Sequence, residues 1–209
     1  MFVYLNALFV GLLVLSNILG VKLFSIGDFV LPAAVIVYVI TYLITDVIGE
    51  VYGKEAAKKT VQAGFFTQII ALIFLFIAIE LPAAPLFGNQ QEFETILGGS
   101  LRVILASTLS YLASQHFDVY IFHRLKRKHG AKKLWLRNNV STISSQFVDT
   151  SIFITIAFMG TVPATALLSM MATQYVFKLI VALLDTPITY LFVKIARKEK
   201  ETSDLPISA

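Results

Sequence analysis

Six long apolar segments divide this sequence, and each is close to the length that a helix needs to cross a lipid bilayer. A crossing helix requires roughly 20 mostly apolar residues, because the hydrocarbon core is about 30 Å thick. The segments cover residues 2–20, 29–47, 61–79, 101–122, 140–160 and 173–195. They predict an all-α bundle of six transmembrane helices.

The composition differs from that of an ordinary soluble domain. Hydrophobic residues make up 57% of the 209 residues and charged residues only 14%, whereas soluble domains carry about a quarter charged residues. The absence of cysteine rules out disulfides, Cys-ligated zinc and thiol nucleophiles. No P-loop pattern is present, so ATP binding by that route is not expected.

The breaks between segments fit a single membrane domain over residues 1–198. Gly27 and Asp28 separate the first two spans, and Pro82 and Pro85 open a polar loop after the third. The apolar piece 164–172 is too short to span, so we expect an interfacial or re-entrant turn there. Residues 199–209 are polar and predict a disordered tail.

Lys and Arg residues alternate between the connecting loops. They occur after the second span, in the 124–137 loop and after the sixth span, but not between the fifth and sixth spans. The positive-inside rule then places both termini in the cytoplasm of a multi-pass protein in a plasma membrane, either the bacterial inner membrane or an archaeal membrane. Because the basic residues adjoin apolar spans, the net charge of +4 does not indicate nucleic-acid binding.

Several ionisable residues lie at membrane depth, where a charge costs at least a few kcal/mol and is rarely without a role. Asp149 is about nine residues into the fifth span. Lys178 and Asp185 lie seven residues apart on one face of the sixth. Asp118 is deep in the fourth span, and Arg102 lies at the start of that span.

Polar residues at helical spacing extend these faces. Gln146 lies three residues before Asp149, and Gln174 lies four before Lys178, so each pair shares a helix face. With Asn17 of the first span, they predict a polar cavity walled by the first, fifth and sixth helices. The alternative is that these groups only hold helices together, with Lys178 neutralising Asp149.

A second group of polar residues predicts gating or structural roles rather than ligand contact. Asp118 is expected to pair with Arg124 at the cytoplasmic edge, and Glu50 with Lys54 at a basic rim. The three histidines show no metal-ligand spacing, so neither a metal nor a cofactor is expected. The group comprises Asp46, Glu50, Gln115, Asp118 and Asp185.

Short motifs along five spans resemble, in their order and spacing, those of a known family. The chain is similar to the queuosine-precursor transporters, also described as vitamin-uptake transporters. The residues that carry the resemblance are Ser16-Asn17, Thr45-Asp46, Gly53, Arg102, Gln115, Asp118-Val119, Phe122, Arg124, Trp135-Leu136, Ser141-Thr142, Asp149-Thr150, Phe153, Tyr175, Phe177-Lys178 and Pro187.

The resemblance implies a fold like that of the substrate-binding S-components of energy-coupling-factor vitamin transporters. It also implies uptake of a 7-deazaguanine such as preQ0, preQ1 or queuine, by a carrier that acts without an ATPase module. We expect alternating access, membrane lipid around the bundle and no enzymatic activity. A homodimer is compatible with a carrier of this size.

The residues suit such a cargo. A carboxylate accepts two N–H donors at once, amides supply the complementary groups, and a cationic side chain donates to a ring carbonyl. Aromatic side chains stack on flat bicycles. The expected substrate-binding residues are Asn17, Arg102, Gln146, Asp149, Phe153, Gln174, Tyr175 and Lys178.

Two other functions stay open on the sequence. The first is an S-component that requires a partner ATPase, for which Ala7 and Gly11, four residues apart on the first span, give slight support. The second is an intramembrane aspartyl enzyme using two of Asp46, Asp118, Asp149 and Asp185, although paired-carboxylate chemistry needs the two groups within a few Å of each other. A purely structural membrane protein does not explain so many buried ionisable residues.

Overall fold

The computed structural model describes the backbone of residues 1–129 and 134–203. Some side chains within these ranges lie outside the description, namely those of Lys54, Val119, Phe122, Lys126, Lys128, His129, Tyr190 and residues 134–139, 182–188 and 199–203.

The described residues form six α-helices and one β-hairpin, which confirms the prediction of an all-α bundle. Each predicted span lies within, or largely within, one helix. The elements in chain order are α1 (Phe2–Leu19), β1 (Leu23–Ile26), β2 (Phe29–Pro32), α2 (Ala34–Tyr52), α3 (Lys54–Glu80), α4 (Gln90–His129), α5 (Leu134–Phe158) and α6 (Ala164–Ser203).

Five helices of the described chain are long and apolar enough to cross a membrane: α1, α2, α3, α4 and α6. Helix α5 has 25 residues, which at about 1.5 Å per residue also exceeds the hydrocarbon thickness. It carries polar side chains, of which Ser141 and Ser145 are buried in the protein. A helix whose polar face is covered by its neighbours crosses the bilayer without exposing that face to lipid.

The outer surface of the bundle is apolar. On α3 alone, exposed side chains include Phe66, Ile69, Ile73, Phe74 and Ile77, all at least 46% exposed. A contiguous apolar face of this extent is not stable in water. Lipid chains solvate it, and the chain is therefore a multi-pass membrane protein.

The connection between α1 and α2 is a β-hairpin, whereas the sequence predicted only a break there. Residues 29–32, which we assigned to the second span, form β2 and pair antiparallel with β1, with Ile26 opposite Phe29. Gly27 has a φ of +59°, and glycine takes this conformation readily at the first position of a two-residue hairpin turn. The short apolar strands adjoin apolar spans, so hydropathy alone does not separate them.

The prediction of a separate turn at 164–172 is wrong. These residues are the first turns of α6, which begins at Ala164 directly after Pro163 and continues to Ser203. Proline before a helix is compatible with its start because the missing N–H needs no partner there. The predicted tail overlaps the end of this helix, and residues 204–209 lie outside the described part of the chain.

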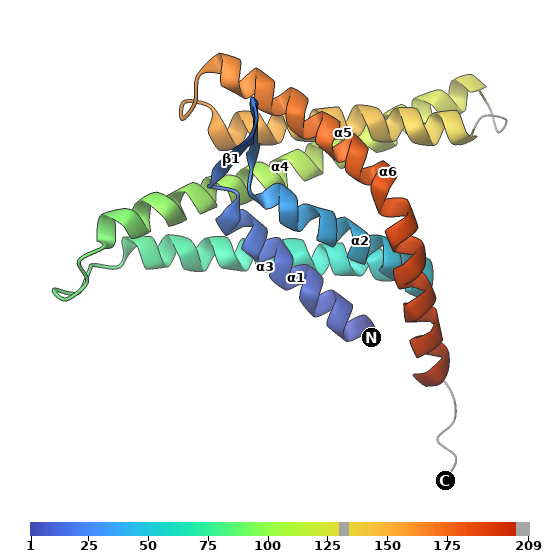
Figure 1. Ribbon diagram of the computed structural model, residues 1–209, viewed down its shortest axis with the longest axis horizontal. Coiled ribbons are helices and arrows are strands. Elements are labelled where there is room, and N and C mark those ends of the chain that lie inside the picture. The colour runs from blue at the N-terminus through green and yellow to red at the C-terminus, as the bar shows by residue number, and fades with distance from the viewer. Residues whose placement is uncertain (130–133, 204–209) are drawn as a thin grey trace, which may run out of the picture.

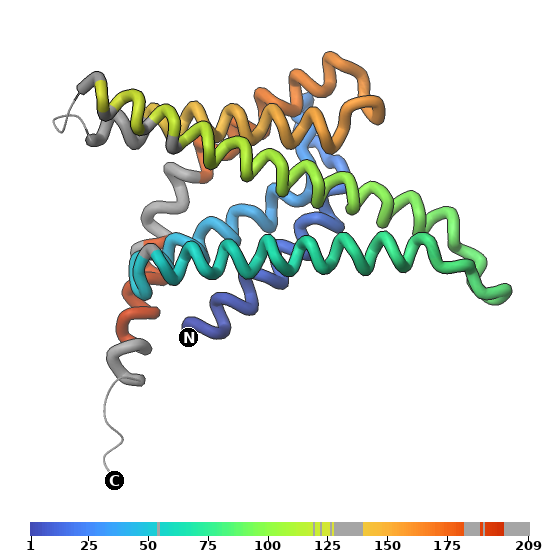
Figure 2. The backbone as a smooth tube through the Cα atoms, turned by 180° about the vertical axis from the view of Figure 1, so that it is seen from behind, coloured from blue at the N-terminus to red at the C-terminus, as the bar shows by residue number. Residues whose placement is uncertain are grey.

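Three apolar clusters hold the elements together. Phe9 and Leu13 of α1 pack on Ile44 and Ile48 of α2, and Val47 and Val51 of α2 pack on Val193 and Ala196 of α6. Helix α6 bends, so its first part lies along α5 and its second part reaches α2 (Figure 1). Figure 2 gives the view from behind, in which α3 crosses in front of α1.

The largest of these clusters closes one end of the bundle. Val103 and Ala106 of α4, Phe153, Ile154, Ala157 and Phe158 of α5 and Met170 of α6 are buried there. Val21, Leu23 and Val30, in and beside the hairpin, pack against this cluster. The hairpin therefore covers the end of the bundle at which α5 turns into α6.

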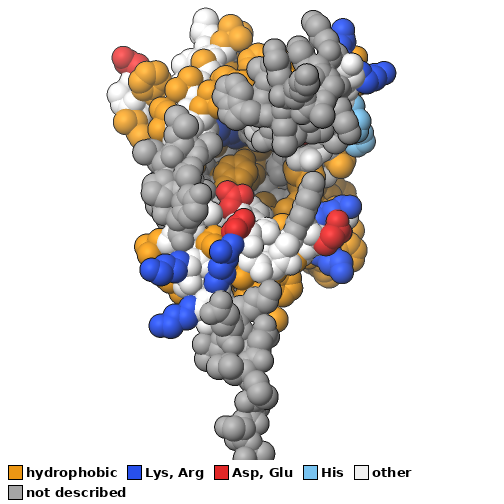
Figure 3. Space-filling view, turned by 90° about the vertical axis from the view of Figure 1, so that its right-hand side faces the viewer, with side chains coloured by type: hydrophobic (Ala, Val, Ile, Leu, Met, Phe, Trp, Pro, Cys, Tyr) orange, Lys and Arg blue, Asp and Glu red, His pale blue; other side chains and the backbone are white. Residues whose placement is uncertain are grey.

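The junction of α2 with α3 and the end of α4 lie at the opposite end of the bundle (Figure 1), and basic residues gather there. Exposed residues of this end include Lys58, Lys59, Arg127 and Arg197, and Figure 3 shows Lys and Arg side chains on several sides of this face. The connection between α3 and α4 and the turn between α5 and α6 contain no Lys or Arg. The fold thus gathers at one end the loops that the positive-inside rule places in the cytoplasm.

Close packing of α1 on α3 generates a stability prediction. A Cβ atom added at Gly64 would lie 2.7 Å from Leu13 Cδ2 and 2.7 Å from Phe9 Cε1, whereas one added at Gly11 meets nothing within 4 Å. We expect Gly64→Val to destabilise the protein by about 1–3 kcal/mol through overpacking. Gly11→Val is the matched control and should lie within about 1 kcal/mol of wild type. Thermal unfolding in detergent measures both, and equal effects would contradict the packing.

The different charge of the two ends of the bundle predicts which end faces the cytoplasm. Because the chain has no native cysteine, single introduced cysteines can test this orientation. A cysteine at Gly88, in the α3–α4 connection, should react with a membrane-impermeant maleimide in intact cells. A cysteine at the exposed Lys58 should react only after the membrane is permeabilised. The reverse pattern would show that the bundle has the opposite orientation.

Candidate functional site

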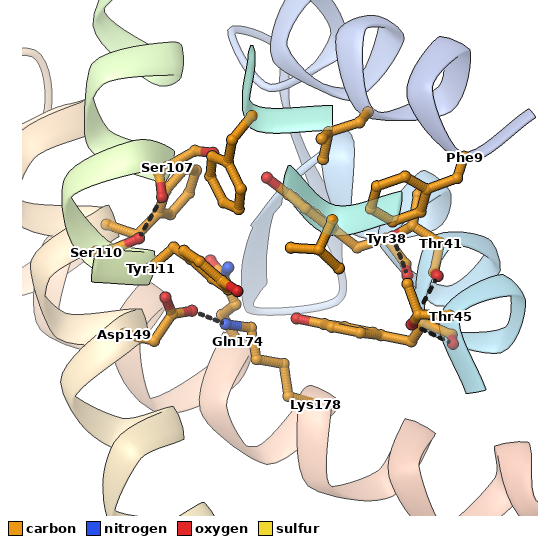
Figure 4. Close-up of a pocket in the computed structure, with 15 residues that line it drawn as sticks. Phe9, Tyr38, Thr41, Thr45, Ser107, Ser110, Tyr111, Asp149, Gln174 and Lys178 are labelled. Carbon is orange, nitrogen blue, oxygen red and sulfur yellow. Dashed lines mark hydrogen bonds and ion pairs between the residues drawn. The ribbon is translucent and has the colours of Figure 1, made fainter. Parts of the chain in front are cut away.

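A cavity of about 150 Å³ lies in the middle of the bundle. A cavity of about this volume accommodates an aromatic ring such as benzene. All six helices contribute to its wall (Figure 4), through Phe9, Leu13, Tyr38, Thr41, Tyr42, Thr45, Val61, Phe65, Ser107, Ser110, Tyr111, Asp149, Phe153, Gln174 and Lys178.

An ion pair between α5 and α6 forms the charged part of the wall. Lys178 Nζ donates to Asp149 Oδ2 at 2.6 Å, and the Lys178 and Asp149 side chains are 12% and 19% exposed. The second carboxylate oxygen, Oδ1, accepts from Ser114 Oγ of α4 at 3.4 Å. Asp149 therefore connects three helices, and its remaining accessible surface faces the cavity.

Hydroxyl groups line the cavity along two helices that the sequence analysis did not assign to it. On α2 these are Tyr38, Thr41, Tyr42 and Thr45, and on α4 they are Ser107, Ser110 and Tyr111. Thr41 Oγ1 donates to Tyr38 O at 2.8 Å, and Thr45 Oγ1 donates to Tyr42 O at 2.8 Å. Because these donors are used within the helix, the lone pairs of the hydroxyl oxygens stay available to a ligand.

The spacing of these hydroxyl residues in the sequence indicates that they share helix faces. Tyr38, Thr41, Tyr42 and Thr45 follow the spacing i, i+3, i+4, i+7, and residues 107, 110, 111 and 114 of α4 repeat it. This spacing places all four members on one helix face. Neither stripe contains a charge or an amide, so the prediction from intramembrane charges and amides did not include these hydroxyl groups.

Gln174 brings an amide into the wall next to the ion pair (Figure 4). Its side chain is 4% exposed, and its Oε1 atom is buried without a hydrogen-bond partner. An unpaired buried acceptor costs about 1–3 kcal/mol. A ligand N–H in the cavity would remove this cost.

Aromatic rings surround the polar groups. The cavity wall includes the rings of Phe9, Tyr38, Tyr42, Phe65, Tyr111 and Phe153. Phe65 and Tyr111 lie with ring centroids 4.2 Å apart across α3 and α4. Flat aromatic faces on several sides, with polar groups between them, suit a planar molecule with a polar rim.

Four of the eight predicted binding residues line this cavity, namely Asp149, Phe153, Gln174 and Lys178. The other four lie elsewhere. Arg102 donates through Nε to Ile156 O at 2.6 Å and through Nη2 to Met159 O, so it caps the C-terminal end of α5. Tyr175 donates its hydroxyl to Ile143 O at 3.3 Å and packs edge-on against Phe147.

Two predicted amides lie outside the cavity wall. Asn17 donates through Nδ2 to Leu13 O at 3.0 Å, and it lines a separate apolar cavity between α1, α3 and α4. Gln146 has a buried Oε1 atom without a hydrogen-bond partner. The predicted wall of the first, fifth and sixth helices is therefore incomplete, because α2, α3 and α4 contribute as well.

The residues predicted for gating or structure are distributed over the surface and the helix contacts. Asp118 Oδ1 accepts from Ser145 Oγ at 3.2 Å, and Arg124 donates to the Tyr120 hydroxyl at 3.0 Å. The expected ion pair between Asp118 and Arg124 is thus not among the contacts of the described residues.

Glu50 pairs with Arg197 of α6. The expected pairing of Glu50 with Lys54 lies outside the description, because the side chain of Lys54 is not described. Asp46 and Gln115 are exposed. The side chain of Asp185 also lies outside the description. Asp46, Glu50, Gln115 and Asp118 are not among the described residues that line the cavity.

The chemistry that this arrangement supports is recognition. Asp149 contacts a lysine and a serine, and Asp118 contacts a serine, whereas carboxylate-pair catalysis requires two carboxyl groups that share a proton. Within the described residues there is no group of three or more His, Cys, Asp or Glu side chains that could hold a metal ion.

Comparison with known proteins gives consistent results. The model of the family described as "Putative vitamin uptake transporter" matches residues 32–192. A Bacillus subtilis (strain 168) protein named "Probable queuosine precursor transporter" is 36% identical over 150 residues, which cover 70% of this chain and 65% of that protein. The match therefore spans just under two thirds of the relative's length. No solved structure matches the chain.

The buried ion pair generates a prediction that does not depend on any ligand. We expect Asp149→Asn and Lys178→Met each to destabilise the protein by about 3–5 kcal/mol, because each leaves an uncompensated charge in the wall. The double variant removes both charges and should be clearly more stable than the sum of the single effects implies. Thermal unfolding of the four proteins in detergent measures the coupling. Additive effects would contradict the contact.

Proposed function

Because this chain belongs to the vitamin uptake transporter family, we propose that it carries a small flat cargo across the plasma membrane. The proposed cargo is a 7-deazaguanine precursor of queuosine, such as preQ0, preQ1 or queuine. The observation that carries this proposal is the Asp149–Lys178 pair, which faces a central cavity walled by aromatic rings. The name of the Bacillus subtilis relative supports the same class of cargo.

The edge of a guanine-like ring matches the ion pair. This edge presents two adjacent N–H donors beside a carbonyl acceptor. A carboxylate accepts two donors side by side, and an ammonium group donates to the carbonyl. Asp149 and Lys178 offer these two functions from atoms 2.6 Å apart. A guanine-like edge would therefore engage both residues without removing the charge balance between them.

The remaining wall suits the body of the same ring. Base-to-aromatic stacking contributes about 1–3 kcal/mol in nucleic-acid proteins. Tyr111 offers an aromatic ring close to Asp149 (Figure 4), and Phe153 offers a second ring in the same cavity wall. The free Oε1 atom of Gln174 accepts a further N–H. We propose that these residues orient the ring while Asp149 and Lys178 identify its edge.

Alternating access is the transport mechanism that we propose. The cavity lies between the helices, while the apolar cluster under the hairpin covers the bundle at the end with few basic residues. Release at the basic end and entry at the hairpin end would need the two ends to open in turn. Contacts of α6 with the hairpin strand β2 at one end and with α2 at the other provide a direct connection between them.

The proposal predicts a loss of uptake in an Asp149 variant. Hydrogen bonds to a charged acceptor contribute about 1.5–3 kcal/mol each, so Asp149→Asn should lower preQ0 affinity about 10- to 150-fold. Uptake of radiolabelled preQ0 into cells that lack other uptake routes measures the effect, with expression confirmed for each variant. Glu94→Gln is the matched control, because Glu94 is exposed and outside the cavity. Unchanged uptake in Asp149→Asn would refute the proposed site.

A further inference from the structure

Among the described residues that line it, the central cavity has one charge of each sign. Asp149 and Lys178 are the acidic and the basic member of the fifteen residues that line it, and they contact each other at 2.6 Å. The other lining side chains are aromatic, aliphatic, hydroxyl or amide groups. The described wall of the cavity is therefore electrically balanced.

A bound ammonium group would disturb this balance. Moving an ammonium group from water into a largely apolar site is costly unless an unpaired anion receives it. Here the carboxylate of Asp149 already has a cationic partner, and the ammonium of Lys178 would repel a second cation nearby. The aromatic faces offer cation–π contacts, but these recover only part of the hydration that the cation loses. A neutral ring has none of these costs.

From this charge balance, and resting on the proposed function, we infer that the cavity selects its cargo by charge and that Lys178 is the residue that excludes cationic rings. The candidate 7-deazaguanines differ in this property. PreQ0 carries a neutral nitrile, whereas preQ1 and queuine carry alkylamines that are protonated near neutral pH. The preferred cargo is therefore a neutral ring of the preQ0 kind.

Lys178 has two roles in this arrangement. Its ammonium group compensates Asp149 and is available to the carbonyl of the cargo, and the same positive charge disfavours an ammonium-bearing substituent. Removal of this charge would leave Asp149 as an unpaired anion facing the cavity. Such a site prefers cations, so the selectivity should reverse when Lys178 is replaced by a neutral residue of similar length.

The wild-type protein provides the first test. Binding of three rings to the purified full-length protein is measured by calorimetry at neutral pH. The rings are preQ0, preQ1 and the 7-hydroxymethyl analogue, which is neutral and nearly the same size as preQ1. We expect both neutral rings to bind at least about tenfold more tightly than preQ1. Equal affinities, or tighter binding of preQ1, would overturn the inference.

The variant Lys178→Met provides the second test. The ratio of the preQ1 to the preQ0 dissociation constant should fall by at least about tenfold relative to wild type. Lys194→Met is the matched control, because Lys194 is an exposed lysine of the same helix outside the cavity, and its ratio should equal that of wild type. An unchanged ratio in Lys178→Met would show that Lys178 does not set the preference.

The binding experiment distinguishes a failure of the proposed function from a failure of the charge rule. If none of the three rings binds, the proposed cargo is wrong and this inference fails with it. If all three bind with similar affinity, the cargo class stands and only the charge rule is wrong. The comparison of rings on the wild-type protein needs no variant, so a folding defect in Lys178→Met would not remove the test.

Discussion

The contact between Lys178 and Asp149 is the interaction on which the site depends. A charged group inside a bundle that lipid surrounds loses most of its hydration, and it stays charged at low cost only when a partner compensates it. The 2.6 Å contact between α5 and α6 supplies this partner, and the Ser114 hydroxyl of α4 adds a hydrogen bond. Three helices are thereby fixed around one carboxylate. Without this arrangement the cavity would have no charged edge.

The rest of the fold places this edge at the centre of an otherwise apolar bundle. Helices α1, α2 and α3 pack on one another through Phe9, Leu13, Ile44 and Ile48, while the hairpin covers the cluster formed by α4, α5 and α6. Helix α6 contacts both parts because it bends along its length (Figure 1). The cavity lies between these packed regions, where a rearrangement of one against the other would change access to it.

Part of the site was predictable and part was not. Asp149 and Lys178 were identified from the sequence because a charge inside an apolar span is unusual and costly. Gln174 followed from its spacing to Lys178. Arg102 satisfies the same criterion, yet it caps α5 through the carbonyl groups of Ile156 and Met159. Depth in the membrane therefore indicates that a polar residue has a partner, but it does not indicate whether that partner is a ligand or a helix end.

The sequence by itself determined the membrane environment and the number of helices, because hydropathy and length act locally along each span. It also determined which end carries the basic loops. Only the tertiary structure decided which side chains meet, since the rotation of each helix about its axis is set by packing against its neighbours. Tyr38, Thr41, Ser107 and Tyr111 reach the cavity for this reason, while Asn17 and Tyr175 do not. The hairpin likewise depends on partners far along the chain, because strands of four residues need the surface of α4, α5 and α6 to be stable.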